Sequence, residues 1–328
     1  MTVKLNRRQA LVSGAAMAAS LAAPAIAQEK PKILFSSVMN EQDVRAVAFR
    51  QFGEDISEAF DFEPYFNSTL FAQGTELVGI QRGNLDMNPM ATQDISKQLP
   101  AWSILTSAYL FRDVDHVKTF LNSDIGNDYK RMAEEEVGVH VLGPSYYGTR
   151  HLGLRTQERV NTPEDMSSIK LRMPGGEAWQ FLGKALGANP TAMAYAEVYT
   201  GLQSGTIDGQ DNPLPNVRSM KFYEVLTQIA LTGHFIAFDV LAISAKRWKS
   251  FSEEQQQILQ SAADKALEAG TEGNLKQEAE LADFFRKEGL DVYTPDVEAF
   301  RTHARQMYES SPLAEGWIAG SGEAIAAL

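Results

Sequence analysis

Arg172 combines a residue type and a sequence setting that suit the capture of an anion. It lies in the apolar run Ile169–Met173, and the turn Pro174–Gly176 follows at once. The sequence therefore predicts an arginine at the carboxyl end of a strand, where ligand crevices of open α/β sheets lie. A guanidinium presents a planar fork of donors that fits both oxygens of a carboxylate. The alternative is a surface arginine paired with an acid, and this residue alone leaves both open.

The segment Lys170–Pro213 has the pattern of an alternating α/β unit. Apolar residues at helical spacing predict a helix over Glu177–Leu186. A short strand is expected over Ala192–Tyr195, and a second helix is expected to end near Gly205. Asp208–Pro213 is predicted to be a polar turn. This order of elements predicts a mixed sheet with helices packed against it.

Three parts of this segment, in fixed order, resemble the signature region of TRAP transporter solute-binding proteins of the C4-dicarboxylate-binding (DctP) type. They are Leu171–Gly175, Ala188–Tyr199 and Leu202–Pro213. The resemblance extends over essentially the whole mature chain. It implies a two-domain α/β fold like that of periplasmic binding proteins, with a ligand cleft between the domains and a long helix spanning both. It also implies delivery of solute to a TRAP permease with small and large membrane subunits.

The same resemblance implies residues for an organic acid. Arg172 would hold the carboxylate, and Arg150 in Gly148-Thr149-Arg150 would be the second arginine, with Arg155 as the competing candidate. Asn212 would contact the same carboxylate, and Tyr195 would supply either an aromatic wall of the ligand site or a hydroxyl contact to the ligand.

Four further polar residues are weaker candidates for ligand contact. Asn40 and Gln93 are expected at strand ends that face the cleft, or else in solvated loops. His234 is expected near the start of a long apolar strand, either lining the cleft or buried as a structural histidine. Glu177 would repel a second carboxylate but accept hydrogen bonds from hydroxyl groups. This favours a sugar acid such as a hexuronate over a C4-dicarboxylate or a 2-oxo acid.

Composition and motifs narrow the class of protein. The formal charge of −12 disfavours binding to nucleic acid, and the absence of cysteine excludes disulfides and thiolate catalysis. No hydrolase, P-loop or zinc-protease motif occurs, and the five histidines lack metal-ligand spacing. We therefore expect no enzyme activity, no metal and no cofactor. A secreted enzyme acting on an acidic sugar is the alternative.

The N-terminus reads as an export signal, residues 1–27, with a twin-arginine-like start or a general secretory one. Periplasmic localisation follows from it. By the resemblance, residues 28–147 and 238–277 would form domain I, and residues 148–237 and 278–328 domain II. Long helical periodicity from Ile258 to about Glu288 predicts the spanning helix. A monomer is expected.

Overall fold

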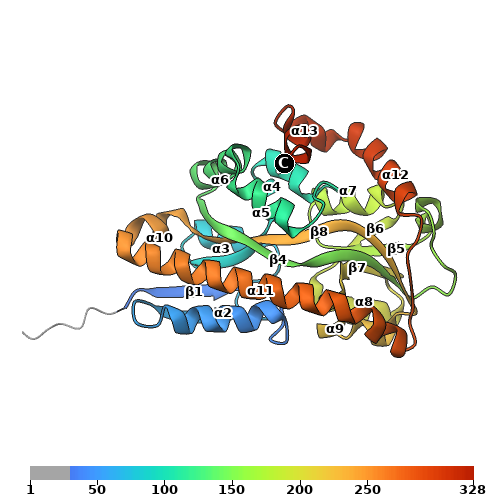
Figure 1. The fold of residues 1–328 in the computed structure, drawn as a ribbon, viewed down its shortest axis with the longest axis horizontal. Helices are drawn as coiled ribbons and strands as arrows, with labels where there is room; N and C mark the ends of the chain where they lie inside the picture. The colour runs from blue at the N-terminus through green and yellow to red at the C-terminus, as the bar shows by residue number, and fades with distance from the viewer. Residues whose placement is uncertain (1–29) are drawn as a thin grey trace, which may run out of the picture. The chain divides into compact units, whose positions relative to one another are not determined.

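The computed structural model describes residues 30–328, and Figure 1 shows their arrangement. The predicted export signal lies outside the described residues. Within residues 30–328, no helix combines the length and the apolar character needed to cross a bilayer.

The strands of residues 30–328 form one nine-stranded sheet. Its order is β2-β1-β3-β8-β4-β7-β5-β6, and β9 pairs with β8 outside this order. The bounds are β1 Lys32–Ser36, β2 Asp61–Tyr65, β3 Met87–Ala91, β4 Val139–Leu154, β5 Lys170–Met173, β6 Asn189–Ala192, β7 Gly209–Pro213, β8 Gln228–Ser244 and β9 Asp291–Tyr293.

Two long antiparallel strands, β4 and β8, join the two halves of this sheet. β3 pairs with the later part of β8, from Asp239 to Ile243. β7 pairs with the later part of β4, from Arg150 to Leu154. The strands β1–β3 therefore gather at one end of the long pair and β5–β7 at the other, as Figure 1 shows.

Helices cover both faces of the sheet. The longest, α11, is 35 residues long and begins at Glu253, after the N-cap Ser252, which forms a capping box with Gln255, so the predicted long helix is confirmed. It packs on α2 and α9, which belong to opposite halves, and on β4. The helix bounds are α2 Val44–Asp55, α3 Glu76–Gln81, α4 Thr92–Ser96, α5 Val114–Asn122, α6 Asp124–Glu136, α7 Glu177–Ala185, α8 Val198–Ser204, α9 Leu214–Ser219, α10 Ala245–Ser250, α11 Glu253–Lys287, α12 Val297–Glu309 and α13 Ser321–Ala326.

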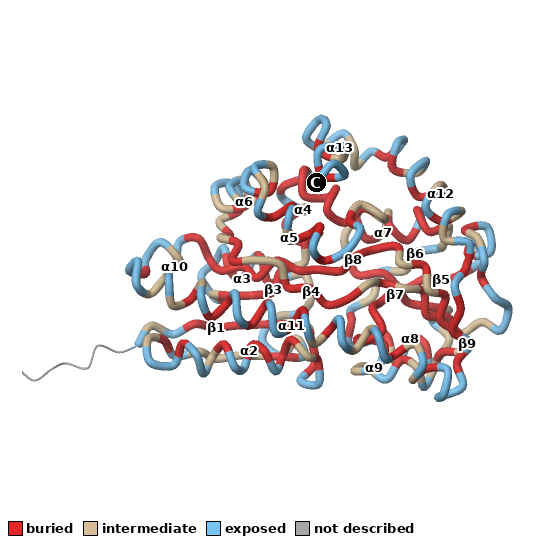
Figure 2. The backbone as a smooth tube through the Cα atoms, in the orientation of Figure 1, coloured by how far each residue is buried: buried red, intermediate tan, exposed pale blue. Residues whose placement is uncertain are grey.

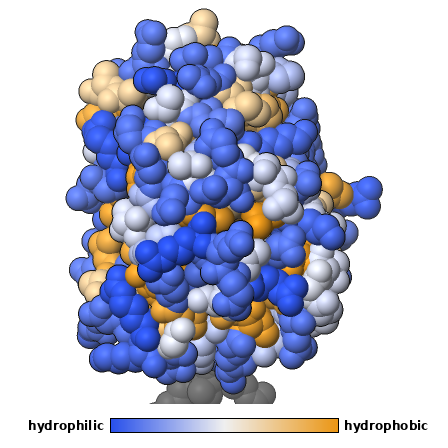
Figure 3. All heavy atoms as spheres, turned by 90° about the vertical axis from the view of Figure 1, so that its right-hand side faces the viewer, coloured by the Kyte–Doolittle hydropathy of each residue, from blue (hydrophilic) through white to orange (hydrophobic). Residues whose placement is uncertain are grey.

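Apolar residues from the strands and the inner faces of these helices make up the core. The buried segments in Figure 2 include most of β4 and nearly all of β8. The end of the molecule that carries β5 and β6 presents mostly hydrophilic side chains, as Figure 3 shows. This division follows from the transfer of apolar surface out of water.

The prediction of a polar turn over Asp208–Pro213 is wrong. Gly209–Pro213 is β7, a strand buried along its whole length between β4 and β5. Its polar side chains reside in the interior because they are paired there, Asp211 with an arginine and Gln210 with Asn212. Buried polar groups are tolerated when they are hydrogen-bonded, and sequence polarity alone does not reveal such partners.

Candidate functional site

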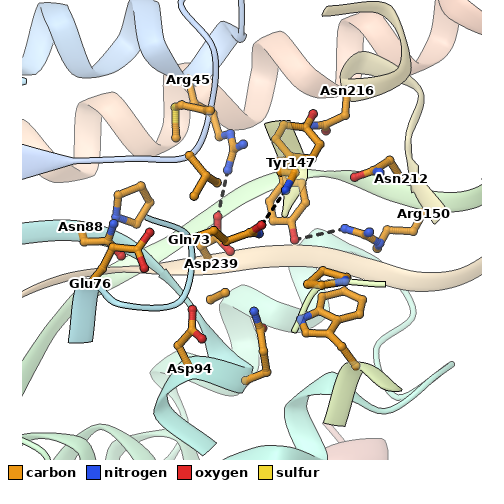
Figure 4. A pocket seen from close by; sticks show the side chains of 18 of the residues that line it. Arg45, Gln73, Glu76, Asn88, Asp94, Tyr147, Arg150, Asn212, Asn216 and Asp239 are labelled. Carbon is orange, nitrogen blue, oxygen red and sulfur yellow. Dashed lines mark hydrogen bonds and ion pairs between the residues drawn. The ribbon is translucent and has the colours of Figure 1, made fainter. Parts of the chain in front are cut away.

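A small polar cavity lies where the strand ends of the two halves of the sheet face one another. Figure 4 shows it from close by. Its volume is about 70 Å³. The lining comes from both halves and consists of Val38, Met39, Arg45, Gln73, Glu76, Asn88, Pro89, Ala91, Gln93, Asp94, Tyr147, Arg150, Arg172, Pro174, Trp179, Tyr195, Asn212, Asn216 and Asp239.

Arg172 is a buried cation in this cavity without an acidic partner. Its side chain extends from β5, its residue exposure is 1%, and no ion pair of residues 30–328 includes it. Its Nε donates to the carbonyl of Met193 at 2.9 Å, and its Nη2 reaches Oε1 of Gln73 at 3.5 Å. Burial lowers the pKa of Arg172 to about 10; the negative charge of Asp211 opposes this shift, and the positive charge of Arg150 adds to it. A buried charge without compensation is costly, so this guanidinium is suited to an anion from outside.

Arg150 lies beside Arg172 in the lining, but its charge is already neutralised. Asp211 on β7 accepts from its Nε at 2.8 Å and from its Nη2 at 2.9 Å, and the carbonyl of Asp211 accepts from the same Nη2. Nη1 of Arg150 remains turned to the Tyr147 hydroxyl at 3.4 Å. The guanidinium also lies 4.6 Å above the Trp179 ring. Arg150 is therefore largely committed to internal contacts.

Asp211 is held ionised although it is fully buried. Burial opposes its ionisation, but the charge of Arg150 and a hydrogen bond from His234 outweigh that cost and lower the pKa of Asp211. Nε2 of His234 lies 3.2 Å from Oδ2 of Asp211, and Nδ1 lies 2.7 Å from the Thr232 hydroxyl. Burial lowers the pKa of His234, which favours a neutral ring that donates to Asp211.

The opposite wall of the cavity is rich in acids and amides. Arg45 on α2 binds Asp43 at 2.9 Å and Asp239 at 3.1 Å, so its charge is compensated. Burial raises the pKa of Asp239 to about 6 and that of Glu76 to about 7. Burial also raises the pKa of Asp94. This wall offers acceptors for hydroxyl groups and is unfavourable for a second carboxylate.

Gln73 reaches Arg172 from the loop between β2 and α3. Its Oε1 accepts from the backbone N–H of Tyr195 at 2.8 Å as well as approaching Arg172. One amide oxygen thus faces two donors, and Figure 4 shows Gln73 at the centre of the cavity. The ring of Tyr195 lies 5.9 Å from the Arg172 guanidinium, and its hydroxyl accepts from Asn216 at 3.0 Å.

Five of the eight residues named from the sequence line this one cavity: Arg172, Arg150, Asn212, Tyr195 and Gln93. Three do not. Glu177 is exposed in the first turn of α7. His234 is fully buried behind Asp211, as the alternative of a structural histidine predicts. Asn40 is buried, but its Nδ2 donates to the sulfur of Met220 at 3.1 Å, outside the lining.

Several lining residues were not found from the sequence, namely Arg45, Gln73, Glu76, Asn88, Asp94, Tyr147, Trp179, Asn216 and Asp239. They come from separate helices, loops and strands, and no local pattern distinguishes them. Asp211 is the chain neighbour of Asn212, and the sequence pattern predicts a turn there. Within residues 30–328, no group of three or more His, Asp and Glu residues is arranged to hold a metal ion.

Comparison with known proteins defines the class. Two halves of a mixed sheet, joined by long strands and facing each other across a polar cavity, are the two-domain fold of periplasmic binding proteins. A solved TRAP periplasmic solute-binding protein from Roseobacter denitrificans, with bound 3-deoxy-D-manno-oct-2-ulosonic acid, matches with a TM-score of 0.90 and 41% identity, over 91% of this chain and 99% of that one. A second from the same species, with bound L-galactonate, has a TM-score of 0.80 and 28% identity, over 86% and 95% of the two chains.

Sequence relatives agree with the structural ones. The sialic acid-binding periplasmic protein SiaP of Vibrio cholerae is 34% identical over 227 residues, 69% of this chain and 70% of the relative. The model of the bacterial extracellular solute-binding proteins, family 7 (DctP), matches residues 35–312. The chain belongs to this family and is a TRAP transporter solute-binding protein. The family and fold predicted from the sequence are therefore confirmed.

Proposed function

We propose that this protein captures a polyhydroxylated monocarboxylate, a sugar acid, by its carboxylate at Arg172. The observation that carries the proposal is the buried guanidinium of Arg172, which forms no ion pair within residues 30–328, beside a wall of acids and amides. The carboxylate neutralises Arg172, and Asn212 lies in the same lining to contact it. The hydroxyl groups of the ligand bind the opposite wall. A buried ion pair with additional hydrogen bonds is favourable when it replaces an unpaired charge.

The ligands of the relatives support this class. Relatives that are at least 25% identical were solved with 3-deoxy-D-manno-oct-2-ulosonic acid, L-galactonate and D-erythronate. A protein of Escherichia coli that binds 2,3-diketo-L-gulonate is 29% identical over 81% of this chain. All are hydroxylated acids with one carboxylate, and a hexuronate belongs to the same class. The acids Asp94, Glu76 and Asp239 disfavour a C4-dicarboxylate.

In this proposal the protein acts in the periplasm, as a monomer, and passes its ligand to the small and large subunits of a TRAP permease. Its relatives are solute-binding proteins, and the proposal includes no reaction. Ligand binding between the domains favours their closed arrangement, with hinges near the predicted crossings at residues 147–148 and 237–238.

Thermal unfolding and calorimetry with a panel of acids test the proposal. A ligand that binds the native state raises the unfolding midpoint by mass action. We expect a rise with sugar acids that is lost in Arg172→Ala, because removing the partner of a buried carboxylate costs about 100-fold or more in affinity. Arg155→Ala is the matched control, since Arg155 is outside the lining. Binding that survives Arg172→Ala, or a dicarboxylate preferred to every sugar acid, would disprove the proposal.

A further inference from the structure

We infer that the ligand site continues past the inner cavity into a second subsite at Lys97 and Asp94, which holds the hydroxylated end of a sugar acid longer than six carbons. The inference rests on the proposed function and concerns the length of the ligand. It makes Lys97 and Asp94 residues that determine specificity.

The first observation is a second chamber, a cavity that shares part of its lining with the inner cavity. It has a volume of about 300 Å³, against about 70 Å³ for the inner cavity. Gln73, Gln93, Asp94 and Pro174 line both spaces. At roughly 10–15 Å³ per water molecule, the inner cavity has room for only a handful of waters. A sugar acid that places its carboxylate on Arg172 therefore extends toward the second chamber.

The second observation is the position of the loop that holds Gln73 and Gly74, which contacts both Arg172 and Lys97. Gln73 contacts Arg172 and the backbone of Tyr195, as described above. The carbonyl of the next residue, Gly74, lies 3.4 Å from Nζ of Lys97. The carboxylate site and the Lys97 site are thus one residue apart along the same loop. A ligand anchored at Arg172 passes along Gln73 and meets Lys97.

Lys97 lines the second chamber and forms an ion pair there. Its Nζ lies 2.6 Å from Oδ1 of Asp94, and the side chain of Asp94 is 11% exposed while that of Lys97 is 41% exposed. The stem of Lys97 runs beside Gly176, where an added Cβ would lie 3.6 Å from Cε. An added Cβ at Gly175 would meet nothing within 4 Å. Gly175 and Gly176 therefore leave open space beside the long side chain of Lys97.

The charges of the chamber select the group at the far end of the ligand. Lys97, Asp94 and Glu197 are its ionisable residues, two acids against one base. A hydroxyl group both donates to Asp94 and accepts from Lys97, whereas a second carboxylate faces two acids. The subsite therefore fits a polyol end and rejects a terminal carboxylate. Hydrogen bonds to charged groups are among the stronger ones in proteins, so they add affinity for a longer ligand.

Calorimetry with three probes tests the inference: D-galacturonate as a six-carbon acid, 3-deoxy-D-manno-oct-2-ulosonic acid as an eight-carbon acid, and galactarate as a dicarboxylate. We expect the wild type to bind the eight-carbon acid at least about tenfold more tightly than galacturonate. Lys97→Met keeps the stem and removes the ammonium. This variant should bind the eight-carbon acid about ten- to 100-fold less tightly than the wild type does. Its affinity for galacturonate should change by less than about threefold. Lys249→Met, at an exposed surface pair with Glu134, is the matched control.

A second variant separates two effects on affinity: the loss of the Lys97 ammonium, and the Asp94 carboxylate that Lys97→Met leaves without its partner. Asp94→Asn combined with Lys97→Met leaves no unpaired acid at this position, and it should still bind the eight-carbon acid at least about tenfold less tightly than the wild type does. Galactarate should bind the wild type less tightly than galacturonate does, because its second carboxylate faces the acids of the inner cavity. Equal losses for the six- and eight-carbon acids in Lys97→Met, or wild-type preference for galacturonate, would overturn the subsite while leaving the sugar-acid function standing. Failure of both monocarboxylates to bind the wild type would overturn both.

Discussion

Asp211 holds Arg150 with both of its carboxylate oxygens, at 2.8 Å from Nε and 2.9 Å from Nη2. The two residues come from adjacent antiparallel strands, β4 and β7. Arg172 in β5 lies in the same lining but has no such acid. Two arginines that look equivalent in the sequence thus have different roles. Arg150 is fixed by its partner and helps shape the site, whereas Arg172 keeps its charge for the ligand.

Because Arg172 has no acidic partner, Arg172→Met should destabilise the ligand-free protein very little or not at all. Removal of an uncompensated buried cation relieves a desolvation cost, although the hydrogen bond to Met193 is lost. We expect the free energy of unfolding of the ligand-free protein to fall by less than about 1 kcal/mol, or to rise. Urea unfolding without ligand measures it. A loss of about 3 kcal/mol or more would show that Arg172 is part of the structural framework.

Asp211→Asn, in contrast, should strongly destabilise the folded protein. It leaves Arg150 and Arg172 as neighbouring buried cations, and breaking a buried ion pair from one side costs about 3–5 kcal/mol. Urea unfolding should show this loss at pH 7. Asp208→Asn is the control, since that carboxylate accepts only a backbone N–H at the exposed strand entrance. Equal effects of the two changes would contradict the role given to Asp211.

Glu76 should make the stability of the protein depend on pH. Burial raises its pKa from about 4.5 to about 7. The folded state therefore binds more protons than the unfolded state between these values, and stability falls as the pH rises from about 4.5 to 7. Glu76→Gln should remove the part of this slope that Glu76 contributes, leave the part that comes from Asp239, and raise stability at pH 8 by on the order of 2–3 kcal/mol.

The test is urea unfolding of both proteins between pH 5 and 8. Glu177→Gln is the matched control because Glu177 is exposed on the surface. It should leave the pH dependence as it is in the wild type. A Glu76→Gln protein with an unchanged slope would mean that Glu76 is ionised at little cost in the folded state.

Gln73→Glu should place a competing carboxylate in the site. The amide oxygen of Gln73 lies 3.5 Å from Nη2 of Arg172, so a carboxylate there would neutralise the cation internally. We expect affinity for sugar acids to fall by about 100-fold and the unfolding midpoint without ligand to rise. Gln257→Glu, on the exposed face of α11, is the control for the added charge. Unchanged affinity in Gln73→Glu would place the carboxylate site away from Gln73.

The family, the long helix α11 and several residues of the cavity could be predicted from the amino acids alone. These depend on local signals: the residues around Arg172, the Gly148–Arg150 motif, and the capping residue Ser252 followed by long helical periodicity. Each family motif is a short run of neighbouring residues, and helical periodicity arises within a single element. Arg172, Arg150, Asn212, Tyr195 and Gln93 were therefore accessible without coordinates.

Which charges are compensated, and which residues form the second wall, depends on contacts that form only when the chain folds. Local polarity predicts a turn at Asp211, but this residue is buried in β7 and paired with Arg150 of β4. Arg45, Gln73 and Asp239 come from an α-helix, a loop and β8, and they meet only when the two halves of the sheet face each other. Glu177 seemed suitable by type, yet α7 turns it to solvent. Pairing and burial depend on contacts between distant segments, and these contacts have no local pattern in the sequence.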